Sequence, residues 1–195
     1  FCRAILDATH LGAGTLVDHR VHLRFELTNT AGEPIAQRLV EDGVVRLLSL
    51  MDHTPGQGQF RTVAAYVRYL QGTYAIDAAA AEALIEAKQQ QSRDVPQTMH
   101  RLAEIAARNE VPLASHDDDS VERVAAVAGL GARISEFPMT REAAEHAGEL
   151  GLYRIVGAPN VLRGGSQGSG LRAIELIDAQ QADILASDYL PAAML

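Results

Sequence analysis

A histidine and three aspartates stand together near the middle of the chain, at the end of an apolar run. The run covers residues 111–115, and His116 and the aspartates at 117 to 119 follow it. The run has the length of a buried strand, and chemistry in α/β folds gathers at the carboxyl ends of such strands. Asp119 and Glu122 have the spacing of a capping box, which predicts a helix directly after this point.

The same arrangement recurs along the chain and predicts the architecture. Four more apolar runs, at residues 44–51, 132–135, 152–157 and 183–187, lead into Asp52 and His53, Glu136, Ala158-Pro159-Asn160, and Asp188. Each run is followed by a helical pattern, which indicates repeated β-then-α units. The last four strand ends lie about 20 to 30 residues apart, as expected for such units. The fold class is therefore α/β with a parallel sheet.

Residues 19–27 alternate strictly between apolar and polar side chains. His22, Arg24 and Glu26 share one face of the predicted strand, and the apolar residues share the other. On one interpretation, the polar face is simply exposed to water. In a closed parallel barrel, however, helices cover the outer face, so these three side chains would line the interior and form a site.

Carboxylates and imidazoles gathered at one end of a parallel barrel are suitable ligands for a divalent metal ion. The predicted ligands are Glu26, His53, His116 and Asp188. Their spacing matches no compact metal motif, so the alternative stays open that His53 and His116 are hydrogen-bonding residues beside the site.

A glycine-rich stretch follows the run that ends at residue 157. Glycines crowd residues 164–170 after Arg163, and a helical pattern begins at Leu171. Backbone N–H groups between a strand and a helix can bind phosphate, and Arg163 would add charge. A flexible connection is the alternative, because the stretch lacks the Gly-Lys-Ser/Thr of the common phosphate loop.

Composition limits the other possibilities. The chain has 195 residues, is 47% hydrophobic and carries a formal charge of −8, which indicates one domain over residues 1–195 and argues against nucleic-acid or membrane partners. Its one cysteine, Cys2, favours the cytoplasm, and no apolar run is long enough to span a bilayer. The first residue, Phe1, lies in a helical pattern, which suggests a piece of a longer protein.

Six ordered motifs resemble a family of triphosphate hydrolases from the carbon–phosphorus lyase pathway of phosphonate metabolism, within the amidohydrolase superfamily. The motifs are His22–Glu26, Ser49–Gln57, Ser115–Asp118, Ile134–Pro138, Gly157–Ser166 and Ser187–Tyr189. The resemblance implies a metal-dependent (β/α)8 TIM barrel, here incomplete, with about six βα units. The family's N-terminal strands, the first of which carries a His-x-His or His-x-Asp metal pair, have no counterpart in this sequence.

The resemblance also implies an activity and a set of site residues. The expected reaction hydrolyses alpha-D-ribose 1-methylphosphonate 5-triphosphate to the 5-phosphate and diphosphate. It would use divalent ions (Zn, Mn or Mg), two of them in the full-length protein, held by the four ligands above, with Asp188 as the catalytic proton acceptor. The residues expected to contact the phosphorylated substrate are His22, Arg24, Asp117, Asn160, Arg163, Gly164, Gly165 and Ser166.

Two other functions fit the sequence. One is a metal-dependent amide or ring hydrolase of the same superfamily, although the glycine-rich stretch with Arg163 favours phosphate. The other is a catalytically incomplete remnant that binds phosphorylated ligands. In either case the open edges of a six-stranded sheet favour association with another copy of the chain.

Overall fold

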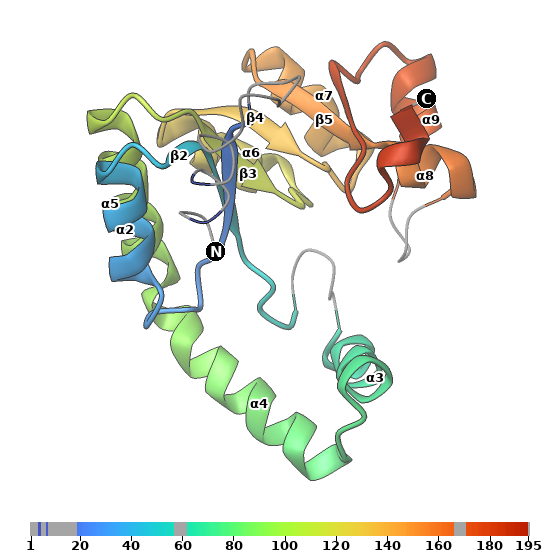
Figure 1. The fold of residues 1–195 in the computed structure, drawn as a ribbon. Helices are drawn as coiled ribbons and strands as arrows, with labels where there is room; N and C mark the ends of the chain where they lie inside the picture. The colour runs from blue at the N-terminus through green and yellow to red at the C-terminus, as the bar shows by residue number, and fades with distance from the viewer. Residues whose placement is uncertain (1–3, 5–6, 8–18, 57–61, 166–170, 195) are drawn as a thin grey trace.

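Six parallel strands form the centre of the molecule. The computed structural model describes residues 4, 7, 19–56, 62–165 and 171–194. The strands lie in chain order across one sheet, each hydrogen-bonded to the next (Figure 1). They are β1 (Val21–Glu26), β2 (Val45–Met51), β3 (Leu113–His116), β4 (Ala132–Glu136), β5 (Tyr153–Gly157) and β6 (Ile184–Ala186). An all-parallel sheet in sequential order is the wall of a (β/α) barrel, so the predicted incomplete barrel is confirmed.

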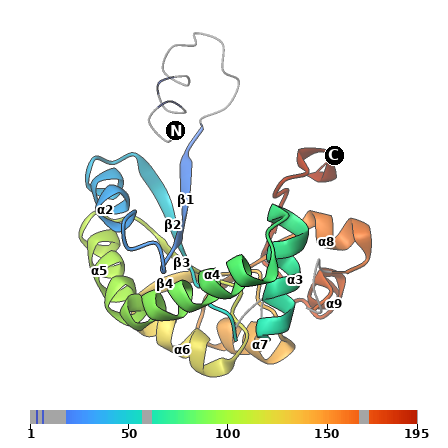
Figure 2. The same cartoon turned by 90° about the horizontal axis from the view of Figure 1, so that it is seen from below.

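Helices connect successive strands and cover the outer face of the sheet. Figure 2 shows α2, α5, α6 and α7 as an arc outside the strands. The helices are α2 (Glu33–Glu41), α3 (Val63–Tyr74), α4 (Ala78–Gln91), α5 (Val95–Arg108), α6 (Val121–Gly129), α7 (Arg141–Glu149), α8 (Ala158–Arg163) and α9 (Ala173–Asp178), with short 3-10 turns at Ser92–Asp94 and Pro191–Met194. Within the described residues, the helices are all too short or too polar to cross a membrane.

The main core lies between the sheet and these outer helices. Phe25 of β1, Leu48 of β2 and Leu113 of β3 pack there with Leu102 of α5 and Val124 of α6. Burying each such side chain contributes roughly 1.5–3 kcal/mol, so the sheet is held firmly from its outer side. Consequently the opposite side chains, including the polar face of β1, are directed to the inner face. The polar side chains of β1 therefore lie on the inner face, as the barrel interpretation predicted, although His22 and Arg24 remain exposed to solvent.

A helical hairpin, α3 with α4, interrupts the alternation between β2 and β3. It has a small core of its own, made by Tyr66, Leu70, Ala81 and Ile85. The hydroxyl of Thr62 accepts a hydrogen bond from the backbone at the start of α3, and Asp77 does the same for α4. Figure 1 shows the hairpin beyond the sheet, on the side where β2 ends.

One local prediction was wrong, because the N-cap of α6 is Ser120 and not Asp119. The hydroxyl of Ser120 accepts a hydrogen bond from the backbone N–H of Arg123 at 3.3 Å. A short helix, α8, precedes the glycine-rich stretch, and its C-cap is Gly164, with a φ of +71°. Proline near the start and glycine after the end explain why this short helix forms there.

Candidate metal centre

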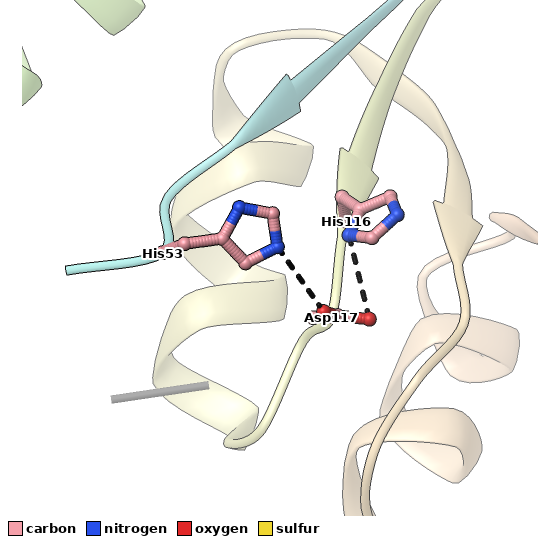
Figure 3. Close-up of side chains that lie close together, drawn as sticks. All are labelled: His53, His116 and Asp117. Carbon is pink, nitrogen blue, oxygen red and sulfur yellow. Dashed lines mark ion pairs between the residues drawn. The ribbon is translucent and has the colours of Figure 1, made fainter. Parts of the chain in front are cut away.

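Three polar side chains meet where β2 and β3 end. His53 follows β2, His116 is the last residue of β3, and Asp117 comes next (Figure 3). Oδ2 of Asp117 lies 3.6 Å from Nε2 of His53, and its Oδ1 lies 3.4 Å from Nδ1 of His116. One ligand atom from each residue lies within 4.8 Å of the others, so the three can hold one metal ion.

The backbone after β3 turns Asp117 toward the two histidines. Successive side chains of a strand point to opposite faces, so a continuing strand would direct Asp117 away from His116. Instead Asp117 has a φ of +54°, and its N–H donates to the carbonyl of Glu136 on β4 at 2.9 Å. A left-handed conformation is uncommon for residues other than glycine, although aspartate is among those that adopt it most readily. Both ligands therefore face the same side.

The next residue, Asp118, anchors this turn on the outer side of the sheet. Its Oδ2 accepts hydrogen bonds from the hydroxyls of Ser115 and Ser135, the latter at 2.6 Å. The guanidinium of Arg123 lies 3.7 Å from its Oδ1. Burial nevertheless raises the pKa of Asp118, because the hydrogen bonds and Arg123 offset the lost hydration incompletely. This fully buried carboxyl ties β3 to β4 directly behind the metal centre.

Glu26 holds His53 from the opposite side. Its Oε2 accepts a hydrogen bond from Nδ1 of His53 at 2.6 Å, and its Oε1 accepts one from the backbone N–H of His53 at 3.2 Å. Lys88 of α4 places its ammonium 3.2 Å from the same Oε1. A carboxylate behind a histidine fixes the ring and leaves the other nitrogen to face a metal ion. Here that nitrogen is Nε2, which faces Asp117.

The charges in the cluster are strongly coupled. Burial alone would lower the pKa of His53, but its interactions with Asp117 and Glu26 outweigh that effect and raise the pKa to about 9. Burial opposes ionisation of both carboxyls, yet the contacts with His53 hold the pKa of Glu26 at about 2, with help from Lys88. His116 and His53 hold the pKa of Asp117 well below its usual range. The centre therefore favours ionised carboxylates beside a cation.

The chemistry of the donors fits a divalent ion. Two imidazole nitrogens and a carboxylate oxygen form a ligand set typical of Zn²⁺ and of other first-row ions. Nδ1 of the buried His116 makes no well-aligned hydrogen bond within the described residues, although Oδ1 of Asp117 lies 3.4 Å from it. A buried polar atom without such a bond costs free energy, and coordination would remove that cost.

Polar residues of β1, β2 and β4 continue the inner face beside His116. Arg24 contacts Nε2 of His116 and lies 3.7 Å from Oε1 of Glu136. The hydroxyl of Ser49 donates to Oε2 of Glu136 at 2.8 Å and lies 2.6 Å from Nε2 of His22. Burial lowers the pKa of His22. Together these contacts place a guanidinium directly against the metal centre.

The structure brings two of the four predicted ligands into one cluster. His53 and His116 belong to the cluster, and Glu26 adjoins it through His53. Asp188, also the predicted proton acceptor, lies outside the cluster, and its Oδ1 is 4.0 Å from Nη1 of Arg24. Asp117, predicted to contact substrate, instead stands among the candidate ligands.

Asn160, Arg163, Gly164 and Gly165, the described residues predicted to contact substrate near the glycine-rich stretch, are not members of this cluster. The side chain of Asn160 donates to the carbonyl of Leu171 at 3.1 Å and accepts from the N–H of Ala173 at 2.9 Å, so it joins α8 to the start of α9. Arg163 is exposed and contacts the hydroxyl of Tyr189. Gly164 and Gly165 follow α8, and Ser166 lies outside the described residues. Their contact with substrate stays a prediction.

Several residues of the site were not identified from the sequence. Glu136 was recognised as the end of a strand, but no role was assigned to it. The usable signal for Glu136 was its position at the carboxyl end of a predicted strand, where polar groups of an α/β site gather. Lys88 lies in a helix rich in alanine, glutamate and glutamine, and nothing near it in the chain indicates a contact with Glu26.

The chain is 40% identical over 179 residues to alpha-D-ribose 1-methylphosphonate 5-triphosphate diphosphatase from Escherichia coli (strain K12). This chain is a relative of that diphosphatase. The match covers 91% of the chain and 47% of the relative, so the chain spans about half of that protein's length. The resemblance predicted from the six motifs is confirmed for this half.

A solved structure supports the fold. The apo N6-methyl-AMP deaminase from Arabidopsis thaliana superposes on the chain with a TM-score of 0.53 at 12% identity, covering 98% of this chain and 51% of the deaminase chain. At this level of identity the likeness concerns the fold alone. No family model matches the sequence.

Proposed function

We propose that the chain is part of a metal-dependent phosphoric anhydride hydrolase of phosphonate metabolism, acting on alpha-D-ribose 1-methylphosphonate 5-triphosphate and releasing diphosphate. The observation that carries the proposal is the cluster of His53, His116 and Asp117, with Arg24 in contact with His116. The similarity of the chain to alpha-D-ribose 1-methylphosphonate 5-triphosphate diphosphatase supports this choice of substrate.

In this proposal His53, His116 and Asp117 hold a divalent ion. Such an ion supplies Lewis-acid polarisation of a phosphoryl oxygen and lowers the pKa of a bound water molecule. Glu26 keeps Nδ1 of His53 occupied by a hydrogen bond, so that Nε2 stays directed at the centre. The turn at Asp117, held by β4, keeps the carboxylate in place before any ion arrives.

The guanidinium of Arg24 would bind and position the triphosphate. This guanidinium can form bidentate hydrogen bonds with phosphoryl oxygens. Its neighbours Glu136 and Asp188, at 3.7 and 4.0 Å, restrain its orientation. Asp188 is about one-third exposed at this edge, so it can accept a proton from a water molecule near the substrate. An amide substrate would have no need of this guanidinium.

A direct experiment follows the phosphorus chemistry. The chain is loaded with Zn²⁺ or Mn²⁺, mixed with the ribose triphosphate substrate and monitored by ³¹P NMR, with and without chelator. Because the chain spans about half of the relative's length, metal-dependent formation of diphosphate and the 5-phosphate is expected to be slow, at under about one hundredth of the rate of a full-length protein. The matched control is His100→Asn, which changes an exposed histidine of α5 and should leave the reaction unaffected.

The other outcomes identify the competing functions. Substrate binding without turnover in the metal-loaded chain would indicate a phosphate-binding remnant. Hydrolysis of cyclic amides with no release of diphosphate would indicate an amide or ring hydrolase. Either result would contradict the proposal.

A further inference from the structure

A cavity of about 570 Å³ adjoins the metal centre, between the α3–α4 hairpin and the turn after β1. His53 lines it on the side of the metal centre, and Tyr66, Tyr69 and Lys88 line it on the side of the hairpin. Its volume lies within the range of small-molecule sites, about 300–1,000 Å³. The cavity is thus large enough for a part of a substrate whose reacting end lies at the metal.

The hairpin contributes an aromatic wall. The rings of Tyr66 and Tyr69 are stacked, with centroids 6.2 Å apart and planes at 24°. The ring of Tyr74 meets Tyr69 edge-on, also at 6.2 Å. Tyr69 is 41% exposed and Tyr74 is 61% exposed, although both line the cavity. Flat aromatic surfaces open to a cavity can stack against the ring of a ligand.

The rest of the lining is polar and includes a cation. Lys88 places its ammonium 5.6 Å from the centre of the Tyr66 ring, where it also reaches Glu26 at 3.2 Å. Thr28 and Asn29 from the turn after β1, and Gln91 from α4, add hydroxyl and amide groups. Hydroxyls and amides can form hydrogen bonds with the hydroxyls of a sugar, and an ammonium can pair with a phosphoryl or phosphonyl group.

We propose that this cavity binds the pentose of a phosphorylated sugar, with its ring stacked on Tyr69 and a phosphoryl or phosphonyl oxygen near Lys88. This assignment rests on the proposed function, because the proposed reaction decides which end of the ligand lies at the metal centre. Arg24 contacts His116, whereas the cavity adjoins His53. A ribose triphosphate would therefore lie across the centre, with its triphosphate at Arg24 and its sugar on the tyrosines.

Tyrosine fluorescence provides a direct assay. The chain has no tryptophan and five tyrosines, and three of these line the cavity. Titration of the 195-residue chain with ribose 5-phosphate should therefore change its emission. Tyr69→Ala should weaken this binding roughly threefold to tenfold, since stacking of an aromatic ring is lost. Tyr69→Phe keeps the ring and should bind within twofold of wild type, which also controls for folding.

Further variants and two further ligands show which part of the ligand each group contacts. Lys88→Gln should weaken binding of ribose 1-phosphate about tenfold, because its phosphoryl group, on the side of the sugar away from Arg24, loses a charge-assisted contact. Inorganic triphosphate, expected at Arg24, should bind Tyr69→Ala with unchanged affinity. Tyr153→Ala removes a 56% exposed tyrosine of β5, outside the cavity, and should bind all of these ligands as wild type does.

The outcomes separate this inference from the proposed function. Ribose 5-phosphate affinity that is undetectable in the wild type, or unchanged in Tyr69→Ala, would overturn the cavity as the sugar site even if diphosphate is released. Binding that depends on Tyr69 in a chain that neither holds metal nor releases diphosphate would support the cavity and overturn the proposed reaction.

Discussion

The inner face of the sheet has two halves that hold their polar side chains in different ways. From β1 to β4, Glu26, Ser49 and Glu136 each contact two or more polar groups from other parts of the chain. Beyond β5, Asp188 and Arg163 are exposed, and β6 has only three residues, with Ile184 40% exposed. In the first half these side chains are held by several neighbours, although the side chain of Arg24 is as exposed as that of Asp188; in the second half the charged groups lie along the open edge of the sheet.

This difference indicates where substitutions should have the largest effects. A metal ligand must be held by its neighbours before the ion binds, because coordination tolerates little displacement. A group that contacts a flexible polyphosphate from an exposed position contributes less, since water competes for the same oxygens. Substitutions in the first half should therefore have larger effects than substitutions in the second half.

Loss of a ligand should have the largest effect. His116→Asn should weaken Zn²⁺ binding by well over a hundredfold, because even removal of a partner behind a ligand costs about 10–100-fold. Competition with a fluorescent chelator measures the affinity. His146→Asn, on α7, is the control and should bind as wild type does. If His116→Asn retains wild-type affinity, the ion is held elsewhere.

Removal of Asp118 should have the next largest effect, on folding. Asp118→Ala should lower the free energy of unfolding by about 2–3 kcal/mol, because the hydroxyls of Ser115 and Ser135 lose a buried acceptor. Urea unfolding followed by circular dichroism measures the change. Asp119→Ala, one residue further along, should cost less. An equal loss at both positions would show that Asp118 has no special place behind the centre.

The free energy of unfolding should also depend on pH through Asp118, in a direction set by its raised pKa. The raised pKa of Asp118 means that the folded chain favours the neutral acid more than the unfolded chain does. Its contribution to stability is complete below the unfolded pKa of about 3.9 and is lost as the pH rises through the folded pKa. Asp118→Asn has no proton to lose there. It should therefore gain stability relative to wild type between pH 4 and pH 7, as measured by urea unfolding.

Glu26→Gln should weaken Zn²⁺ binding about 10–100-fold through the loss of the partner behind His53. It should also change the proton balance. With a pKa of about 9, His53 of the metal-free chain is protonated at pH 7.5, so Zn²⁺ must displace close to one proton from it. Without Glu26 the pKa of His53 falls, so Zn²⁺ binding should release fewer protons. Calorimetry in two buffers of different ionisation enthalpy counts the released protons. Equal numbers for Glu26→Gln and wild type would contradict the role of Glu26 in raising the pKa of His53.

The smallest effect should come from the second half of the sheet. Arg163→Ala should weaken binding of inorganic triphosphate by less than about fivefold, as expected for an exposed charge. Arg24→Ala, the matched change beside His116, should weaken it more. A larger loss at Arg163 would reverse the comparison and place the phosphate contacts near α8.

The sequence predicted the sheet well because buried parallel strands are short apolar runs with abrupt polar ends. Such runs identify β3 and place His116 at its carboxyl end, and the alternation in β1 identifies the face that carries Arg24 and Glu26. These are properties of neighbouring residues, which a single sequence displays directly.

The details of the site depend on contacts that the sequence does not display. Asp117 faces the same side as His116 because its φ is positive, which the residue type permits without requiring. Lys88 reaches Glu26 because the α3–α4 hairpin folds back toward β1. The hydrogen bonds of Asn160 with Leu171 and Ala173 could not be predicted from its motif, and its contact with substrate stays a prediction.

Crystallography of the Zn²⁺-loaded chain tests the central claim most directly, through anomalous scattering at the zinc edge. The account predicts one strong peak bounded by His53, His116 and Asp117, at about 2.0–2.2 Å from two imidazole nitrogens and a carboxylate oxygen. A peak that lacks either histidine as a ligand, or none at the ends of β2 and β3 when zinc is present in excess, would contradict it.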